Sequence, residues 1–411
     1  MSKIKTFIAS ILPGIFLIGY NIGTGSITSM SKAGANFGLE LLWAILISCI
    51  ITYYLINQFS RYTMVTGETI IQGIKKHIHS TFALSLIMAL SIIIVTALIG
   101  ILGIIADVLH VWSNAAFDVN LSQGIWAAVV GFGIYYLIWI GNYSFFEKIL
   151  AILVAIMGLA FVATMLIDFP SFGELGKGLI PSIPKAAEGS DNSSFVIVSG
   201  MVGTTVSVFV FIIRSQIVKE TKWTLADDKV QKRDALISAS MMFIISAAVM
   251  ITAYTTLHVR DIKLNNVVEM IALMEPIAGK AALSFFVIGI LAAGLSSQLP
   301  NTLVIPWLII DYKNESRNIQ SKRNRLILFA LTLSSVLGVA IGLKPILIMM
   351  LSQACISIVM PMALGSLIYL FNTKAKGYQG GPLGNVLMIA ILCFSLYMGI
   401  LGIQGLIADL M

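Results

Sequence analysis

The sequence predicts an all-α integral membrane protein with eleven transmembrane helices. Apolar residues make up 58% of the 411 residues and charged residues only 11%, whereas a water-soluble domain carries about 25% charged residues. A spanning helix needs about 20 apolar residues, so eleven spans use nearly the whole chain. Because lipid offers backbone groups no hydrogen-bond partner, the spans are expected to be helices.

The apolar runs define the spans in order. They cover residues 7–33, 39–64, 82–110, 122–142, 145–168, 195–217, 232–257, 280–312, 325–342, 345–372 and 384–409. The run 280–312 is taken as one helix, because Pro300 and Pro306 interrupt it without a charged loop. The stretches 169–194 and 258–279 are polar connections, the second with a short amphipathic segment.

The positions of lysine and arginine predict the orientation. With a cytoplasmic amino terminus, 18 basic residues lie on the cytoplasmic side and six outside, while Lys32 and Arg214 lie within spans. This predicts a multi-pass protein of the cell membrane (inner or plasma membrane) with an external carboxyl terminus. The net charge of +7 then reflects topology. The expected partners are the lipid bilayer and a small inorganic ion, not nucleic acid; the oligomeric state stays open, and a monomer is compatible with the sequence.

Two spans are interrupted at mid-membrane depth by small polar residues. The first contains Gly23-Thr24-Gly25-Ser26, and the sixth contains Gly203-Thr204-Thr205-Val206-Ser207. Interruptions at corresponding places, five spans apart, indicate an inverted repeat whose broken helices form a central transport site. Small residues also line close helix contacts that bind nothing, and for each cluster alone this interpretation stays open.

The inverted repeat predicts how the chain is divided. The first repeat is expected at residues 1–168 with helices 1–5, and an external loop follows at 169–194. The second repeat is expected at 195–372 with helices 6–10. A loop and an eleventh helix then occupy 373–411.

The sequence resembles the NRAMP (natural resistance-associated macrophage protein) family of divalent-metal transporters from Pro13 to about Asn372. The resemblance rests on Leu12-Pro13-Gly14, Gly34-Ala35-Asn36-Phe37-Gly38, Leu41-Leu42-Trp43, Val65-Thr66-Gly67, Val202-Gly203-Thr204-Thr205, Gln216-Ile217-Val218-Lys219, Glu275-Pro276, Leu291-Ala292-Ala293-Gly294-Leu295-Ser296-Ser297 and Leu351-Ser352-Gln353 followed by Pro361. It implies the LeuT-type fold, a 5+5 inverted repeat with broken helices 1 and 6, and secondary transport of an ion by alternating access.

None of the family's side-chain metal ligands is present. Family members carry Asp-Pro-Gly-Asn and Met-Pro-His in the two broken helices, where this chain has Gly23-Thr24-Gly25-Ser26 and Ser207-Val208-Phe209. Hydroxyls and carbonyls alone do not neutralise a dication in a low-dielectric cavity. The family's acidic positions in helix 3 hold Leu90, Ala97 and Gly100. We therefore expect no family-type proton coupling and no carboxylate in the deep interior.

A neutral substrate site is expected at the two breaks. Its predicted residues are Gly23, Thr24, Gly25, Ser26, Thr204, Thr205, Ser207, Phe209, Arg214 and Gln353. Hydroxyl donors, glycines that let a ligand approach the backbone and the positive ends of half-helices favour a small anion such as bicarbonate. Arg214 is either a functional intramembrane charge or snorkels to the interface. Lys32 faces the same choice and is expected to reach the outer surface.

Sodium is a candidate coupling ion, and no other cofactor is expected. The resemblance to the LeuT-type fold allows a sodium site between the helix 8 hydroxyls of Ser296 and Ser297 and the helix 1 backbone at Ile22. Two alternatives to an anion carrier stay open. The first is a divalent metal cation transporter (Mn, Fe or Mg class) that binds a partly hydrated ion, and the second is a non-transporting sensor or scaffold. The sequence shows no catalytic Ser/His/Asp set and no metal-spaced His pair, so it does not predict an enzyme.

Overall fold

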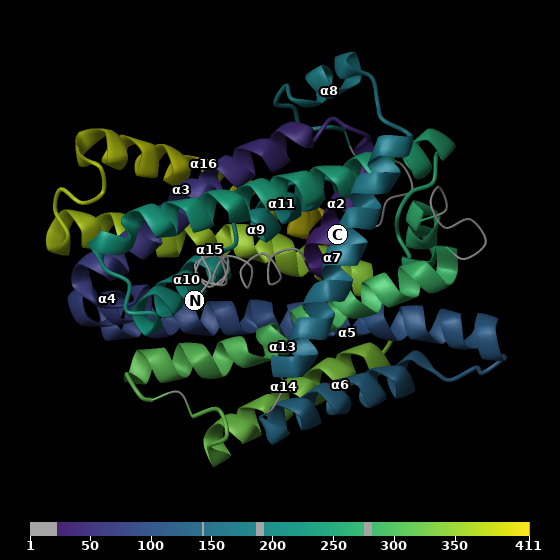
Figure 1. Ribbon diagram of the computed structural model, residues 1–411, viewed down its shortest axis with the longest axis horizontal. Helices are drawn as coiled ribbons and strands as arrows, with labels where there is room; N and C mark the ends of the chain where they lie inside the picture. Colours follow the sequence, from purple (N-terminus) through teal and green to yellow (C-terminus); the bar gives the residue numbers. More distant parts are fainter. Residues whose placement is uncertain (1–22, 142–143, 186–192, 275–281, 317, 411) are drawn as a thin grey trace, which may run out of the picture.

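The computed structural model describes residues 23–141, 144–185, 193–274, 282–316 and 318–410. Every regular element within these ranges is a helix, and most of the long helices run roughly along one common axis (Figure 1). Nine spans in this part of the chain are long and apolar enough to cross a membrane. The predicted fold class, an all-α integral membrane protein, is confirmed.

The spans follow the predicted apolar runs closely. They are α3 (Leu42–Thr66), α5 (Ser80–Phe117), α6 (Gln123–Ile140), the pair α9 (Ser194–Thr205) and α10 (Val208–Glu220), α11 (Asp228–Thr256), α13 (Ala282–Lys313), α14 (Lys322–Ala340), α15 (Pro345–Lys374) and α16 (Gly381–Leu410). Two further helices, α2 (Thr24–Phe37) and α7 (Ser144–Ile167), match the second half of the first predicted span and the fifth span. The described helices are therefore consistent with eleven spans.

Short helices occupy the connections. They are α4 (Ile70–His77), α8 (Phe172–Gly178) and the 3₁₀ turns η1 (Leu225–Asp227), η2 (His258–Arg260) and η3 (Val267–Met274). In Figure 1, α4 lies at the left end of the bundle and α8 lies above its right half; we name the left end the α4 end and the right end the α8 end. The α4 end is rich in basic residues: Arg61, Lys75, Lys76, Lys219, Lys222, Lys229, Lys232, Arg233, Lys313, Lys322, Arg323, Arg325, Lys374 and Lys376.

The sixth span is broken where the sequence predicts. Helix α9 ends at Thr205, and the Val206 amide donates the last helical bond to Val202, at 2.7 Å. Ser207 is extended, with φ −83° and ψ 120°, and α10 begins at the next residue. All of the apolar window of this span is buried, because the pair runs through the middle of the bundle. Helix α13 stays continuous across Pro300 and Pro306, as expected.

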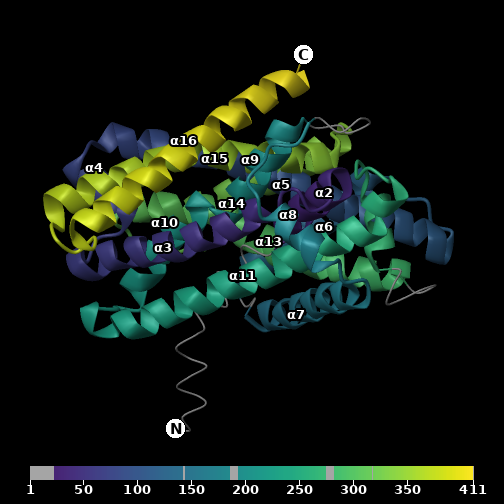
Figure 2. The same cartoon turned by 90° about the horizontal axis from the view of Figure 1, so that it is seen from above.

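Close packing brings α2, from the first predicted span, against the broken sixth span. Helix α2 packs against α11 and α9, while α9 also packs against α15. A Cβ at Gly34 would collide with the carbonyl oxygen of Met250, so α2 and α11 approach at a separation that only glycine permits. Helices α16 and α7 lie on opposite flanks of the molecule (Figure 2), which leaves α2, α9 and α10 inside.

Candidate functional site

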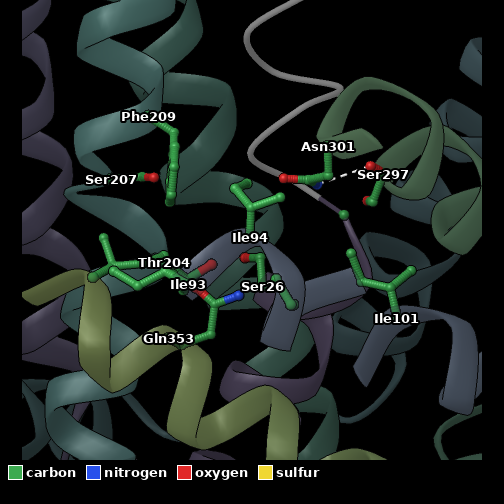
Figure 3. Close-up of a pocket in the computed structure, with 14 residues that line it drawn as sticks. Ser26, Ile93, Ile94, Ile101, Thr204, Ser207, Phe209, Ser297, Asn301 and Gln353 are labelled. Carbon is green, nitrogen blue, oxygen red and sulfur yellow. Dashed lines mark hydrogen bonds between the residues drawn. The ribbon is translucent and has the colours of Figure 1, made fainter. Parts of the chain in front are cut away.

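A small cavity lies where α2 and α10 begin and α9 ends. Its volume is about 50 Å³, and a single water needs about 10–15 Å³ on this measure. The cavity therefore holds a guest of a few atoms and excludes an ion with a complete hydration shell. The residues around it are Gly23, Gly25, Ser26, Ile93, Ile94, Ala97, Ile101, Thr204, Ser207, Phe209, Ser297, Asn301, Gln353 and Ile356 (Figure 3).

Most of the predicted substrate residues meet at this cavity. Those that line it are Gly23, Gly25, Ser26, Thr204, Ser207, Phe209 and Gln353, together with Ser297 from the predicted sodium pair. Thr24 and Thr205 are buried beside the break but do not line the cavity. The Thr205 hydroxyl donates to the Met201 carbonyl within its own helix, at 3.0 Å.

The polar lining consists of hydroxyls and amides. Ser26, Thr204 and Ser207 each present a buried hydroxyl. Gln353 Nε2 lies 3.5 Å from the Met349 sulfur, and Gln353 Oε1 is buried without a hydrogen-bond partner. A Cβ at Gly25 would collide with Gln353 Nε2, so glycine at this position lets the α15 amide reach the start of α2.

Two helix N-termini point at the cavity without side-chain caps. Gly23 and Ser207 are the N-cap residues of α2 and α10, and neither makes a side-chain cap bond. The first bond inside α2 runs from the Ile27 amide to the Gly23 carbonyl, at 3.1 Å, so the amides before Ile27 have no acceptor within the helix. Neither first turn contains an acidic residue. The cavity thus receives the positive ends of two helix dipoles.

The remaining wall is apolar and comes mainly from α5. Ile93, Ile94, Ala97 and Ile101 form this wall, and no charged side chain is among the residues that line the cavity. Across the described ranges, no group of three or more His, Cys, Asp or Glu side chains could hold a metal ion. The described part of the site is therefore electrically neutral apart from its backbone dipoles.

Of the two serines predicted for a sodium site, one borders the cavity and the other does not. Ser297 lines the cavity, and its hydroxyl is buried without a partner. The Ser296 hydroxyl instead donates to the Ala293 carbonyl at 3.0 Å. The Thr24 hydroxyl is also buried without a partner and lies close to Gly294 of α13. Ile22 lies outside the described residues.

Asn301 is a lining residue that the sequence analysis missed. Its Nδ2 donates to the Ser297 carbonyl at 2.8 Å, and both side chains border the cavity (Figure 3). The signal was present in the sequence, because Asn301 follows Ser297 by four residues and so shares its helix face.

Arg214 neither lines the cavity nor reaches the interface. It is fully buried, and its Nη1 lies 2.6 Å from Oδ2 of Asp234, which is 1% exposed. The contact is a buried ion pair. Arg214 Nε also donates to the Ser60 hydroxyl at 3.0 Å. Asp234, near the start of α11, is a buried carboxylate that the sequence analysis did not identify, and it pairs with the intramembrane arginine.

The expectation for Lys32 is wrong. Its side chain is fully buried and does not reach the outer surface. Lys32 Nζ donates to Asn265 Oδ1 at 3.3 Å. The segment before η3 covers the end of α2, so the lysine cannot extend to solvent.

Comparison with known proteins identifies the family. A sequence model described as natural resistance-associated macrophage protein-like matches residues 14–405. The chain belongs to the NRAMP family. It is 24% identical over 407 residues to the divalent metal cation transporter MntH of Caldanaerobacter subterraneus subsp. tengcongensis, covering 95% of this chain and 92% of that protein. It is 26% identical to MntH of Clostridium acetobutylicum over 222 residues, which cover 52% of this chain and 49% of that protein.

Solved structures of the family and of a second transporter family share the fold. A manganese transporter from Eremococcus coleocola, in complex with an aromatic bis-isothiourea compound, superposes with a TM-score of 0.77 at 16% identity, covering 100% of this chain and 88% of that chain. Mhp1, a nucleobase-cation-symport-1 family transporter, gives 0.59 at 16% identity, covering 97% and 91%. The LeuT-type architecture implied by the sequence resemblance is confirmed.

Family membership establishes the coarse function. NRAMP proteins are transporters and not enzymes, so the chain is a multi-pass membrane transporter of a small ion. The relatives are named for divalent metal cations and manganese. These names favour the metal alternative, and they lend no support to bicarbonate or to sodium coupling.

Proposed function

We propose that this NRAMP-family protein is a secondary transporter that works by alternating access and carries a small anion. The observation that carries this proposal is the pair of uncapped helix N-termini, at Gly23 and Ser207, on a cavity whose described lining residues include no carboxylate. Backbone amides and positive dipole ends form a ready-made site for an anion. The lining hydroxyls of Ser26, Thr204 and Ser207 add further donors.

The helix ends at the cavity differ in what they offer a cation. Helix α9 contributes its carbonyl end, and the Thr205 carbonyl already accepts a bond from the Thr52 hydroxyl at 2.8 Å. In the described residues, the cavity therefore faces the amide ends of two helices, α2 and α10, and the carbonyl end of one helix, α9, where one carbonyl already accepts a hydrogen bond. Each dipole end contributes about 0.3–1 kcal/mol toward an anion, and more where the site is buried.

Bicarbonate is the anion we propose by size and availability. It has few heavy atoms, consistent with the cavity volume of about 50 Å³. It accepts hydrogen bonds through its oxygens and can donate one to Gln353 Oε1, which is buried without a partner. No lining residue distinguishes bicarbonate from another small oxyanion.

A divalent metal cation is the second candidate cargo. This candidate is favoured by the sequence similarity to proteins that are named divalent metal cation transporters. Hydroxyl, amide and carbonyl oxygens would have to hold a partly hydrated ion, since the described lining residues include no carboxylate or thioether. An uncompensated buried charge costs several kcal/mol even after relaxation, and this cost is why we place the anion first.

We propose that transport does not use family-type proton coupling. Leu90 and Ala97 are buried apolar residues of α5 at positions where the family has acids, so these positions cannot serve as the family's proton relay. Sodium remains our proposed coupling ion. The unpartnered buried hydroxyls of Thr24 and Ser297, on α2 and α13, support a site for a hard cation between these helices.

The proposed orientation follows from charge. Since cytoplasmic loops carry the excess of lysine and arginine, we infer that the basic α4 end is cytoplasmic and the α8 end external. This gives a cytoplasmic amino terminus and an external carboxyl terminus. We also propose that the two repeats occupy 1–168 and 195–372, joined by 169–194.

Flux in proteoliposomes tests the proposed cargo. Purified protein is reconstituted, and uptake of labelled bicarbonate and of Mn²⁺ is measured in parallel. We expect saturable bicarbonate uptake that Gly25→Val abolishes, because a branched side chain collides with Gln353 and fills the cavity. Saturable Mn²⁺ uptake that the same variant abolishes, without bicarbonate uptake, would establish the metal alternative. A sensor or scaffold would give no saturable flux of either ion.

A further inference from the structure

Lys32 is a buried basic residue in α2, further along the helix than the cavity, and the proposed function assigns it no role. It follows Gly25 by seven residues, so it lies two turns further along α2 on the same helix face. At 1.5 Å per residue the two backbone positions are roughly 10 Å apart. Lys32 is fully buried, so its charge is not screened by bulk water.

A second, larger cavity of about 480 Å³ opens at the α8 end. Its lining includes Asp107, Gln123, Asn265, Asn266, Glu269 and Lys344. We call this cavity the outer vestibule. Lys32 Nζ donates to Asn265 Oδ1 at 3.3 Å, so the lysine contacts a residue that lines the vestibule. Lys32 therefore belongs to the helix that begins at the central cavity, and its side chain reaches the wall of the outer vestibule.

Different faces of α2 contact different parts of the protein. Gly34 packs against Met250 and Ala253 of α11, and it is two positions from Lys32, which places it on nearly the opposite face. Ser29 donates to the Met350 sulfur of α15 at 3.5 Å. Lys32 thus lies on the face turned away from α11, which is the face that continues from Gly25 and the cavity.

We propose that Lys32 is a charge-selecting residue on the outer approach to the cavity. Its ammonium group attracts an anion that leaves the vestibule for the cavity and repels a cation on the same route. The sign of this effect on the cargo rests on the proposed anion function. If the backbone spacing of roughly 10 Å is taken as the separation of the charge and the anion, with an effective dielectric constant of about 20, removing the charge changes the affinity for a monovalent anion by about tenfold.

Charge and shape are separated by three variants in proteoliposomes, with bicarbonate as the probe added at the α8 side. Lys32→Gln should raise the half-saturating bicarbonate concentration about tenfold while the maximal rate changes less than about twofold. Lys32→Arg should stay within about twofold of the unmodified protein. Asn265→Asp leaves Lys32 in place but sets a carboxylate against it, and it should act in the same direction as Lys32→Gln.

Each outcome decides for or against the charge-selecting role. Thermal unfolding in detergent first shows that the variants are folded, and a variant that is not folded is replaced by Asn265→Asp, which keeps the lysine. Unchanged half-saturation in the charge-removing variants would overturn the inference, as would equal impairment by Lys32→Arg and Lys32→Gln.

Failure of the anion proposal gives a different result. If the unmodified protein carries Mn²⁺ and no bicarbonate, the proposed cargo is wrong. A charge-selecting Lys32 then requires that Lys32→Gln lower the half-saturating Mn²⁺ concentration at least tenfold. An unchanged value for Mn²⁺ would overturn the role of Lys32 independently of the cargo.

Discussion

The buried ion pair of Arg214 and Asp234 allows a quantitative prediction. It joins α10 to α11 through a contact of 2.6 Å between two side chains that are 0% and 1% exposed. The guanidinium also binds Ser60 of α3, at 3.0 Å, and lies 5.1 Å from the ring of Trp223. We predict that Asp234→Leu or Arg214→Met alone lowers the free energy of unfolding by about 3–5 kcal/mol, because one buried charge is left without its partner.

The double variant Arg214→Met with Asp234→Leu should recover most of this loss. Replacing a whole buried pair by apolar side chains is often neutral or stabilising, so the double-mutant cycle should give a coupling energy of a few kcal/mol. Thermal unfolding in detergent, followed by intrinsic fluorescence, measures all four proteins. Because Arg214 does not line the cavity, the double variant should keep the half-saturating bicarbonate concentration of the unmodified protein.

Two results would refute this reasoning. Additive losses in the double variant would show that the two side chains do not interact in the folded protein. A double variant that is stable but no longer binds the anion would show that Arg214 acts on the cargo, contrary to its position away from the cavity.

Three further predictions concern other positions. Ser207→Asp should abolish bicarbonate uptake and confer Mn²⁺ binding by calorimetry, while Ser207→Asn keeps uptake; the buried carboxylate should lower the unfolding midpoint in the absence of Mn²⁺, and retained bicarbonate uptake would contradict the anion site. Gly203→Ala should cost about 1–3 kcal/mol of stability, because its Cβ collides with the Gln353 carbonyl oxygen. Gly133→Ala, with no atom within 4 Å of the new Cβ, is the control, and equal unfolding midpoints would oppose the tight packing. Asp311→Asn should lose about 1–3 kcal/mol, because its carboxylate accepts bonds from Thr69, Gln72 and Gln216 at 2.8–3.2 Å; an unchanged midpoint would contradict this.

The fold follows from the sequence because the membrane restricts the alternatives. Apolar runs of about 20 residues can only be helices in lipid, and the break before Ser207 lies where small polar residues interrupt such a run. The continuity of α13 across Pro300 was predictable for the same reason, since no charged loop could leave the bilayer there. The first half of helix 1, with Ile22, lies outside the described residues, so its predicted break stays a prediction.

Side-chain pairing was harder to predict than helix position. Asp234 lies near the start of an apolar run, and only the packing of α10 and α11 against α3 shows that it meets Arg214. Lys32 was expected at the surface because it is near a helix end, but the segment with Asn265 covers it. Ser297 and Ser296 are adjacent in sequence, yet a helix turns neighbours about 100° apart, so only Ser297 borders the cavity.

Anomalous diffraction tests the neutral, anion-binding site most directly. Crystals are soaked separately with bromide and with Mn²⁺, and anomalous peaks are sought between the starts of α2 and α10. The account predicts a bromide peak within hydrogen-bond reach of Ser26 or Ser207 and no Mn²⁺ peak there. A well-occupied Mn²⁺ peak among these hydroxyls, with no bromide, would contradict it.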